Sequence, residues 1–381
     1  MSRLFLTGCL VVVNGLWAAF ALSRAAADEP SLATDPANCG GAGHDCGGGA
    51  CVKGACQAMA VQAGIRELGG FAVDASGVYY TSNPGDFDMR LLRCPTSGCA
   101  LQPDQLASGL ANGQAVQLGP DDVFFGAAPI QSTTRNSVYT CPKTGCAAPP
   151  ISLFNSGLMG GAGEDLVATG DRWFSSFGGG ILSCQLTRGQ PCERTGIPAT
   201  EHIYRSHGTF PLAVDAKFVY FGYVPPAPGE APRHQNLMAC PLESDCSAPT
   251  LLANDLVPDA LAAFQGTVYI LQKGGQGGAP NGALLTCSAS SCGSDGPAVF
   301  TRKLAYPTAL AVDASGVYWF ASDANEIDTC PLSGCGGGPR TVASDVKGAR
   351  TLVLWRGFVY WAAPDLEQPG VTWSSIHRIA M

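Results

Sequence analysis

Histidine and carboxylate side chains that could carry out acid–base chemistry gather in one region of the sequence. Glu201, His202 and His207 lie in one stretch without a strand pattern, and Arg233 and His234 lie in the next such stretch. If the two stretches meet, an imidazole and a carboxylate in contact could act as general acid and base, or hold a metal ion. A lyase or hydrolase is therefore one functional hypothesis.

The same residues also fit a binding surface without catalysis, and we favour this interpretation. The sequence lacks the His-x-x-x-His, Gly-x-Ser-x-Gly and phosphate-loop patterns that mark particular reactions. We expect no catalytic residue, no metal site and no cofactor. The residues expected to bind a ligand are Glu201, His202, Tyr204, His207, Tyr223, Arg233, His234 and Trp373.

An apolar N-terminal stretch predicts export of the chain. Residues 4–22 are apolar apart from Thr7 and Asn14, they follow Arg3, and small residues precede position 28. This layout is typical of a signal peptide, here residues 1–27. The alternatives are an uncleaved membrane anchor or lipid attachment at Cys9. We expect a secreted protein, extracellular or periplasmic, that does not insert into the membrane after cleavage.

Cleavage leaves sixteen of the 17 cysteines, an even number that suits disulfide bonding in an oxidising compartment. Four lie in a glycine-rich segment that has no large apolar residue to form a core. We call residues 28–56, a linker with this segment, the stub. Two disulfides are expected there, with three possible connectivities, and a zinc site that includes His44 is the alternative. The stub cysteines are Cys39, Cys46, Cys51 and Cys56.

The other twelve cysteines form six close pairs that recur every 43 to 56 residues, about the period of propeller blades. Each pair follows an alternating apolar run, a polar turn and an aromatic run, so four short strands per repeat are expected. The pairs are Cys94/Cys99, Cys141/Cys146, Cys184/Cys192, Cys240/Cys246, Cys287/Cys292 and Cys330/Cys335. Each pair can close its own hairpin, so we expect them to staple single blades and not to join neighbouring blades.

The number of aromatic runs predicts the number of blades. Seven such runs occur, from Val78-Tyr79-Tyr80 to Val359-Tyr360-Trp361, one more than the cysteine pairs. We therefore expect an all-β, seven-bladed propeller over residues 57–381, preceded by the disulfide-rich stub. The last repeat lacks a fourth strand, and residues 58–63 could supply it and close the ring.

The repeats resemble a known family. The phrase from Leu310 to Cys335, with Tyr318-Trp319, is similar to the YWTD-type repeat of extracellular receptor propellers, and more loosely to secreted bacterial propellers. No copy carries the following Thr-Asp, that family has six blades, and its members lack a cysteine pair in each blade. The resemblance implies a propeller that binds partners, and it transfers no functional residues.

Two more sets of polar residues have structural interpretations. Asp74, Asp215 and Asp313 each follow a first strand, where an aspartate side chain accepts backbone hydrogen bonds in a turn. His377 lies in an expected strand and is interpreted as structural.

Loop lengths place the function on one face. The unequal glycine- and proline-rich loops, 126–137, 222–237, 272–284 and 362–375, fall on the face opposite the cysteine hairpins. A net charge of −8 makes nucleic acid a poor partner. We expect a secreted or cell-surface propeller that binds a protein or carbohydrate without catalysis. A structural envelope or matrix component is a further alternative.

The cysteine scheme predicts a thiol count. Chains lacking residues 1–27 should show no iodoacetamide-reactive thiol when they are denatured without reductant, because all sixteen cysteines are paired. Mass spectrometry counts the label. Several labelled cysteines per chain would overturn the scheme.

Overall fold

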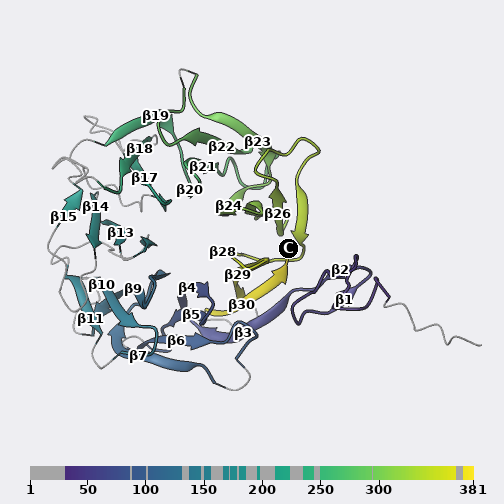
Figure 1. Cartoon of the computed structure of the whole chain (residues 1–381), viewed down its shortest axis with the longest axis horizontal. Helices are drawn as coiled ribbons and strands as arrows, with labels where there is room; N and C mark the ends of the chain where they lie inside the picture. Colours follow the sequence, from purple (N-terminus) through teal and green to yellow (C-terminus); the bar gives the residue numbers. More distant parts are fainter. Residues whose placement is uncertain are drawn as a thin grey trace, which may run out of the picture.

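Antiparallel β-sheets stand side by side in a ring in the computed structural model of the protein (Figure 1). The structure describes residues 31–85, 88–99, 102–130, 137–146, 150–155, 166–170, 172–177, 180–185, 195–197, 211–223, 235–243, 249–293, 295–365 and 372–381. These ranges contain strands and turns, and none of them forms a helix long and apolar enough to cross a membrane.

The strands fall into a small hairpin, one large sheet and five four-stranded sheets. The hairpin joins β1 (Cys51–Val52) and β2 (Ala55–Cys56). The large sheet holds β4 (Leu68–Asp74), β5 (Gly77–Ser82), β6 (Met89–Cys94), β7 (Asp104–Ala111), β8 (Val116–Leu118), β9 (Asp122–Pro129), β10 (Ser137–Pro142) and β11 (Ile151–Asn155).

Three four-stranded sheets follow in chain order. Their strands are β12 (Leu166–Thr169), β13 (Arg172–Phe177), β14 (Gly180–Gln185) and β15 (Thr195–Ile197), then β16 (Leu212–Val214), β17 (Phe218–Tyr223), β18 (Gln235–Pro241) and β19 (Thr250–Leu256), then β20 (Ala260–Phe264), β21 (Thr267–Gln272), β22 (Gly282–Ser288) and β23 (Ala298–Leu304).

The last two sheets complete the ring. The penultimate sheet contains β24 (Pro307–Asp313), β25 (Gly316–Ala321), β26 (Glu326–Cys330) and β27 (Arg340–Ala343). The closing sheet contains β28 (Leu352–Trp355), β29 (Phe358–Asp365), β30 (Trp373–Ala380) and β3 (Met59–Arg66).

The prediction of seven separate blades is wrong. Five sheets are four-stranded blades, and β4 to β11 form one eight-stranded sheet. The join lies between β7 and β9, where Leu110 pairs with Pro129 and Ala111 with Ala128. Ala111 and Ala128 are fully buried, and their small side chains let the two backbones approach. The propeller architecture itself is as expected.

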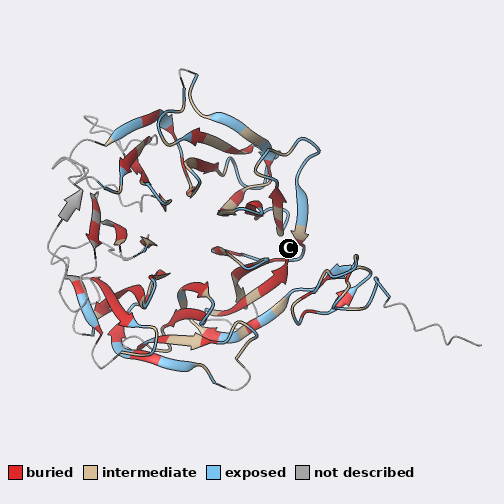
Figure 2. Ribbon diagram, in the orientation of Figure 1, coloured by how far each residue is buried: buried red, intermediate tan, exposed pale blue. Residues whose placement is uncertain are grey.

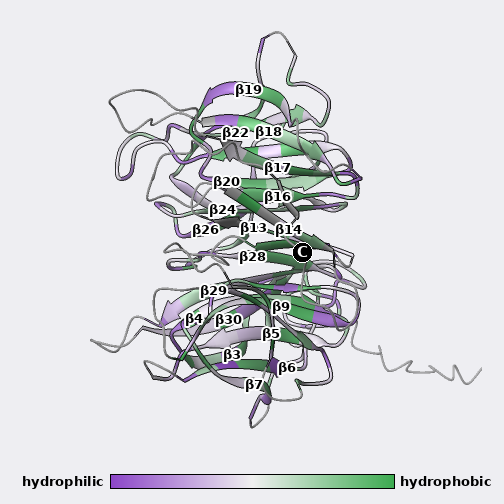
Figure 3. Cartoon of the chain, turned by 90° about the vertical axis from the view of Figure 1, so that its left-hand side faces the viewer, coloured by the Kyte–Doolittle hydropathy of each residue, from purple (hydrophilic) through white to green (hydrophobic). Residues whose placement is uncertain are grey.

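The aromatic second strands form the core because they are buried on both faces. Every residue of β25 is buried, as is every residue of β5 (Figure 2). Alternate side chains of β25 point to opposite neighbours: Tyr318 and Phe320 pack towards the closing sheet, and Trp319 packs towards β20–β23. A strand buried on two faces needs an unbroken apolar run, which explains the recurring Val-Tyr-Trp phrase. Figure 3 shows such a hydrophobic stretch in the second strand β17.

The cysteine pairs close hairpins, as expected, and two of their backbone amides contact other strands. Disulfides link Cys94–Cys99, Cys141–Cys146, Cys287–Cys292 and Cys330–Cys335. The amide of Cys146 donates to Leu106 O on β7, and that of Cys99 donates to Val61 O on β3, at 3.0 and 3.1 Å. The disulfides themselves therefore staple single hairpins, as predicted; the Cys99 amide in addition contacts the closing sheet, whereas Leu106 lies in the same eight-stranded sheet as the Cys141–Cys146 hairpin.

The two remaining pairs are described in part. Cys184 and Cys240 are disulfide-bonded. Their predicted partners, Cys192 and Cys246, lie outside the described residues.

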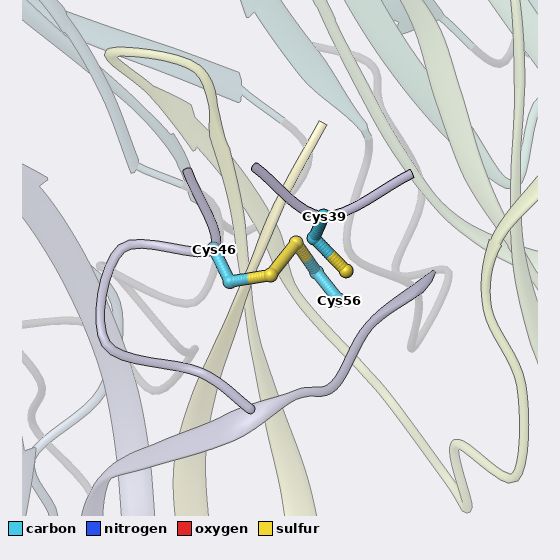
Figure 4. Close-up of side chains that lie close together, drawn as sticks. All are labelled: Cys39, Cys46 and Cys56. Carbon is cyan, nitrogen blue, oxygen red and sulfur yellow. A yellow bond between two sulfur atoms is a disulfide. The ribbon is translucent and has the colours of Figure 1, made fainter. Parts of the chain in front are cut away.

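The stub folds around two crossed disulfides, one of which, Cys46–Cys56, is drawn in Figure 4. They join Cys39 to Cys51 and Cys46 to Cys56, which selects one of the three connectivities. The sulfur atoms of Cys39, Cys46 and Cys56 lie within 4.8 Å of one another. Because these sulfurs are bonded in disulfides, they are not available as thiolate ligands for zinc.

The ring closes through a strand from the N-terminal region. β3 pairs with β30, from Met59 opposite Arg378 to Arg66 opposite Trp373. This pairing confirms the strand expected at residues 58–63 as the partner of the last repeat. The inner strand β28 also contacts β4, so the first and last sheets meet.

A register shift typical of a β-bulge recurs in four edge strands, β3, β19, β23 and β27, and in β7, which lies inside the eight-stranded sheet. The residues at or just beyond each shift with positive φ are Gly64, Gly109, Asp255, Lys303 and Asp345. A bulge twists an edge strand and hinders its pairing with another chain.

Removing a hairpin disulfide should lower the free energy of unfolding by more than the entropy of closing its short loop accounts for. On the chain-entropy model a six-residue loop contributes about 2 kcal/mol. Cys330 is 1% exposed and packs with Trp319 between sheets. We therefore expect Cys330→Ala/Cys335→Ala to lower the free energy of unfolding by more than about 2 kcal/mol, measured by denaturant titration. The exposed hairpin variant Ser333→Ala should change it by less than about 0.5 kcal/mol. Equal effects would contradict an inter-sheet role.

Candidate functional site

Most of the residues predicted to bind a ligand lie outside the described residues. These are Glu201, His202, Tyr204, His207, Arg233 and His234. Tyr223 ends β17, where the backbone alone is described. Trp373 begins β30, is half-buried, and pairs with Asp365 on one side and Arg66 on the other. The histidine site therefore stays a prediction, and Trp373 is placed on the closing sheet.

A pocket opens beside Trp373, between the closing sheet and β4. We call it the seam pocket, because it lies where the two ends of the ring meet. It has an empty volume of about 510 Å³, counting the part open to solvent. It is lined by Leu68, Gly69, Gly70, Phe71, Arg350, Thr351, Ala362, Ala363, Pro364, Thr372 and Ser374.

The lining residues place the seam pocket on the face of the long loops. They come from the start of β4, the segment before β28, the end of β29 and the start of β30. The loop between β29 and β30 belongs to the predicted binding face, and the cysteine hairpins lie at the other ends of these strands. Sequence reasoning missed the pocket because its walls lie almost 300 residues apart in the chain.

Backbone contacts fix the wall formed by β4. The chain leaves β3 at Glu67, whose amide donates to Thr372 O at 2.8 Å. Gly69 must be glycine, because a Cβ there would lie 2.0 Å from Gly113 O. The Gly70 amide donates to Thr81 Oγ1 at 3.2 Å, and Thr81 Oγ1 donates to Gln114 O at 2.8 Å. This wall is therefore rigidly attached to the segment that enters β8.

Asn83 links three segments behind that wall. Its side-chain amide donates to Gly113 O at 3.2 Å, and its Oδ1 accepts from the Gly113 amide at 2.7 Å. Its backbone amide donates to Arg66 O at 3.1 Å. The end of β3, the end of β5 and the segment before β8 are thus held together by one side chain.

Arg350 is the charged residue among those that line the seam pocket. Arg350 is exposed, and its backbone amide donates to Ala362 O at 3.3 Å, which fixes the chain without using the guanidinium. Arg350 forms no ion pair with an acidic residue of the described part of the chain. The carboxylate on β29, Asp365, accepts a hydrogen bond from the Ser375 hydroxyl, and its two oxygens lie 2.8 and 2.9 Å from Ser375 Oγ. A cation beside apolar lining residues suits a ligand with a carboxylate beside an apolar group.

His377 lies below the seam pocket, between sheets, as expected for a structural residue. Its ring stacks on Trp361, with centroids 5.5 Å apart and planes at 16°. Burial lowers the pKa of His377 below its ordinary value of 6.5, and the charge of Asp365 opposes that shift. A neutral imidazole is therefore favoured in the folded chain.

The turn aspartates act as predicted and also reach neighbouring segments. Asp74, Asp215 and Asp313 accept hydrogen bonds from amides two residues later. Asp74 Oδ2 also accepts from Lys143 Nζ at 2.5 Å, and Asp215 Oδ2 accepts from the Gly266 amide at 3.0 Å. Burial alone would raise the pKa of Asp74, but hydrogen bonds from Lys143 and Ser76 hold it below its ordinary value.

Comparison with known proteins shows the fold. No protein-family model matches the chain, and no curated protein matches it. Among solved structures, YCF48 bound to D1 peptide is 9% identical with a TM-score of 0.56, over 85% of this chain and 96% of that one. The WD40 β-propeller domain of Doa1 is 9% identical with a TM-score of 0.52, over 84% and 95%. The chain is thus similar to β-propellers in architecture.

The burial of His377 predicts a pH-dependent stability. Since its pKa is lower in the folded chain, the unfolded chain binds the proton more readily, and the free energy of unfolding falls as pH drops through about 6.5. We expect His377→Phe, which keeps a ring on Trp361, to lose less stability than the wild type between about pH 7 and pH 5. Denaturant titrations at both pH values test this. Parallel losses in both proteins would show that His377 does not contribute.

Proposed function

We propose that the protein is a secreted, non-catalytic propeller that binds a segment of a partner protein in the seam pocket. The observation that carries the proposal is the combination of apolar lining residues with a cation, Arg350, that pairs with no acidic residue of the described part of the chain. Leu68, Phe71 and Pro364 can contact an apolar side chain, and the guanidinium can pair with a neighbouring carboxylate.

The rigidity of the pocket walls supports a binding role. The hydrogen bonds of Glu67, Gly70 and Asn83 position the β4 wall before any ligand arrives, so little conformational entropy is lost on binding. The position on the face of unequal loops agrees with the usual placement of binding residues on rigid scaffolds. The solved YCF48 propeller is bound to a D1 peptide, an example of a propeller that takes a peptide.

Secretion is part of the proposal and rests on two features. The apolar stretch at residues 4–22 fits a signal peptide, and disulfides buried between sheets must form as the chain folds, which requires an oxidising compartment. The bulged outer strands argue against a structural role in which sheets associate edge to edge.

Selection from a displayed random-peptide library tests the proposal. We expect the selected peptides to carry an apolar residue beside an acidic residue or a C-terminal carboxylate. Arg350→Ala should weaken their binding at least about tenfold, because a charge-assisted pair is lost. Lys347→Ala removes another exposed cation, three residues away, and should leave binding unchanged.

A blocking variant locates the site. Thr351 is exposed and lines the pocket, so Thr351→Trp should fill the seam pocket without disturbing the core. Peptides that bind this variant as they bind the wild type would contradict the proposed site. Both proteins can also be tested on a glycan array. A glycan that binds the wild type but not Thr351→Trp would show that the seam pocket binds a carbohydrate, which would contradict a protein partner.

A further inference from the structure

The closing sheet lacks the disulfide that its neighbours have. On β26, Cys330 stands opposite Val317 of β25, and on β22, Cys287 stands opposite Val268 of β21. At the same register of the closing sheet, Ile379 of β30 stands opposite Val359 of β29. The interface between the penultimate and closing sheets therefore has no hairpin cystine of its own.

The stub supplies cystines to that interface. Its four cysteines belong to the apolar cluster between the two sheets, together with Ile379 and Val359 of the closing sheet and Tyr318 and Ala343 of the penultimate sheet. Cys39 and Cys46 are 0% and 2% exposed. The stub, with β1 and β2, lies outside the ring beside the closing sheet (Figure 1), and its disulfides extend the apolar cluster of this interface.

A buried arginine attaches the stub to the closing sheet. Arg378 on β30 is 8% exposed and donates through Nη2 to Gly47 O in the stub. Its guanidinium lies 4.8 Å from the ring centroid of Phe358, and its Nε lies 3.4 Å from Met59 Sδ on β3. Gly47 itself packs against the Phe358 ring so closely that a Cβ there would lie 2.2 Å from it. One cation therefore contacts the stub, β29 and β3 together.

Besides its disulfides the stub is held by internal hydrogen bonds, such as those from the Gly40 amide to Leu32 O and from the Cys46 amide to Pro36 O, and it has no core of large apolar side chains. β1 and β2 have two residues each, and the apolar residues Leu32 and Val52 are 47% and 48% exposed. The two disulfides, which span 12 and 10 residues, are buried where a hydrophobic core would be. Without them the stub cannot present Gly47 to Arg378 and Phe358.

We propose that the stub is a disulfide-dependent clasp that holds the ring closed. β3 begins three residues after Cys56, so the stub fixes one end of the strand that joins the two ends of the ring. Reduction by a dithiol breaks both S–S bonds: four electrons and four protons pass to the sulfurs, and two cyclic disulfides form. The stub then releases Arg378, and β3 separates from β30. This inference does not depend on what the seam pocket binds.

Native-state hydrogen exchange of the full chain, followed by mass spectrometry, tests the clasp. The variants are Cys39→Ser/Cys51→Ser and Cys46→Ser/Cys56→Ser. We expect amides of residues 59–66 and 373–380 to exchange at least about tenfold faster in both, while residues 260–288 stay unchanged. The matched control, Cys287→Ser/Cys292→Ser, should speed exchange within β20–β23 and leave β3 as it is.

If the double cysteine variants fail to fold, a variant that keeps every cysteine still tests the proposal. Arg378→Met removes the cation but retains the length of the side chain, and it should also speed exchange on β3, with the stub disulfides intact by mass. The proposal fails if β3 exchanges at the wild-type rate while the stub amides exchange freely. It also fails if the Cys287/Cys292 control opens β3 as much as the stub variants do.

Discussion

The packing of each sheet against the next is the interaction on which the ring depends. The second strand of a sheet is covered on both faces, so a sheet alone would expose the apolar side chains of both its faces. Cystines lie within these interfaces, and the amides of Cys99 and Cys146 donate to the outer strand of the preceding segment. A cystine in this position closes its own hairpin and also packs in the interface between one sheet and the next.

The positions of single strands and turns could be predicted from the sequence. The contacts between strands that lie far apart in the chain could not. The repeated Val-Tyr-Trp phrase located the second strands, and Asp-Ala-Ser-Gly located the turns, because both depend on neighbours within a few residues. The pairing of Ala111 with Ala128 depends on two short segments meeting in space, so it left no periodic signal and the blade count was wrong.

The candidate site shows the same limit more strongly. Trp373 could be identified from the sequence as an aromatic residue next to a long loop. The pocket beside it also needs Gly69, where a side chain would collide with Gly113 O, and that contact is not visible in the sequence. Arg350 looks like an ordinary exposed cation until Ala362 and Pro364 are placed beside it. The pocket arises from ring closure, so no single repeat contains it.

Ring closure also explains why the closing sheet needs extra attachment. The contact between Met59 and Arg378 joins residues 319 apart, whereas Val317 and Cys330 are neighbours in a hairpin. Loop-closure entropy grows as the logarithm of loop length, and the longer loop costs about 3 kcal/mol more. Two disulfides that constrain the stub before it docks, and a buried arginine that contacts three segments at once, can offset a cost of that size. The stub is therefore best understood as part of the ring and not as a separate module.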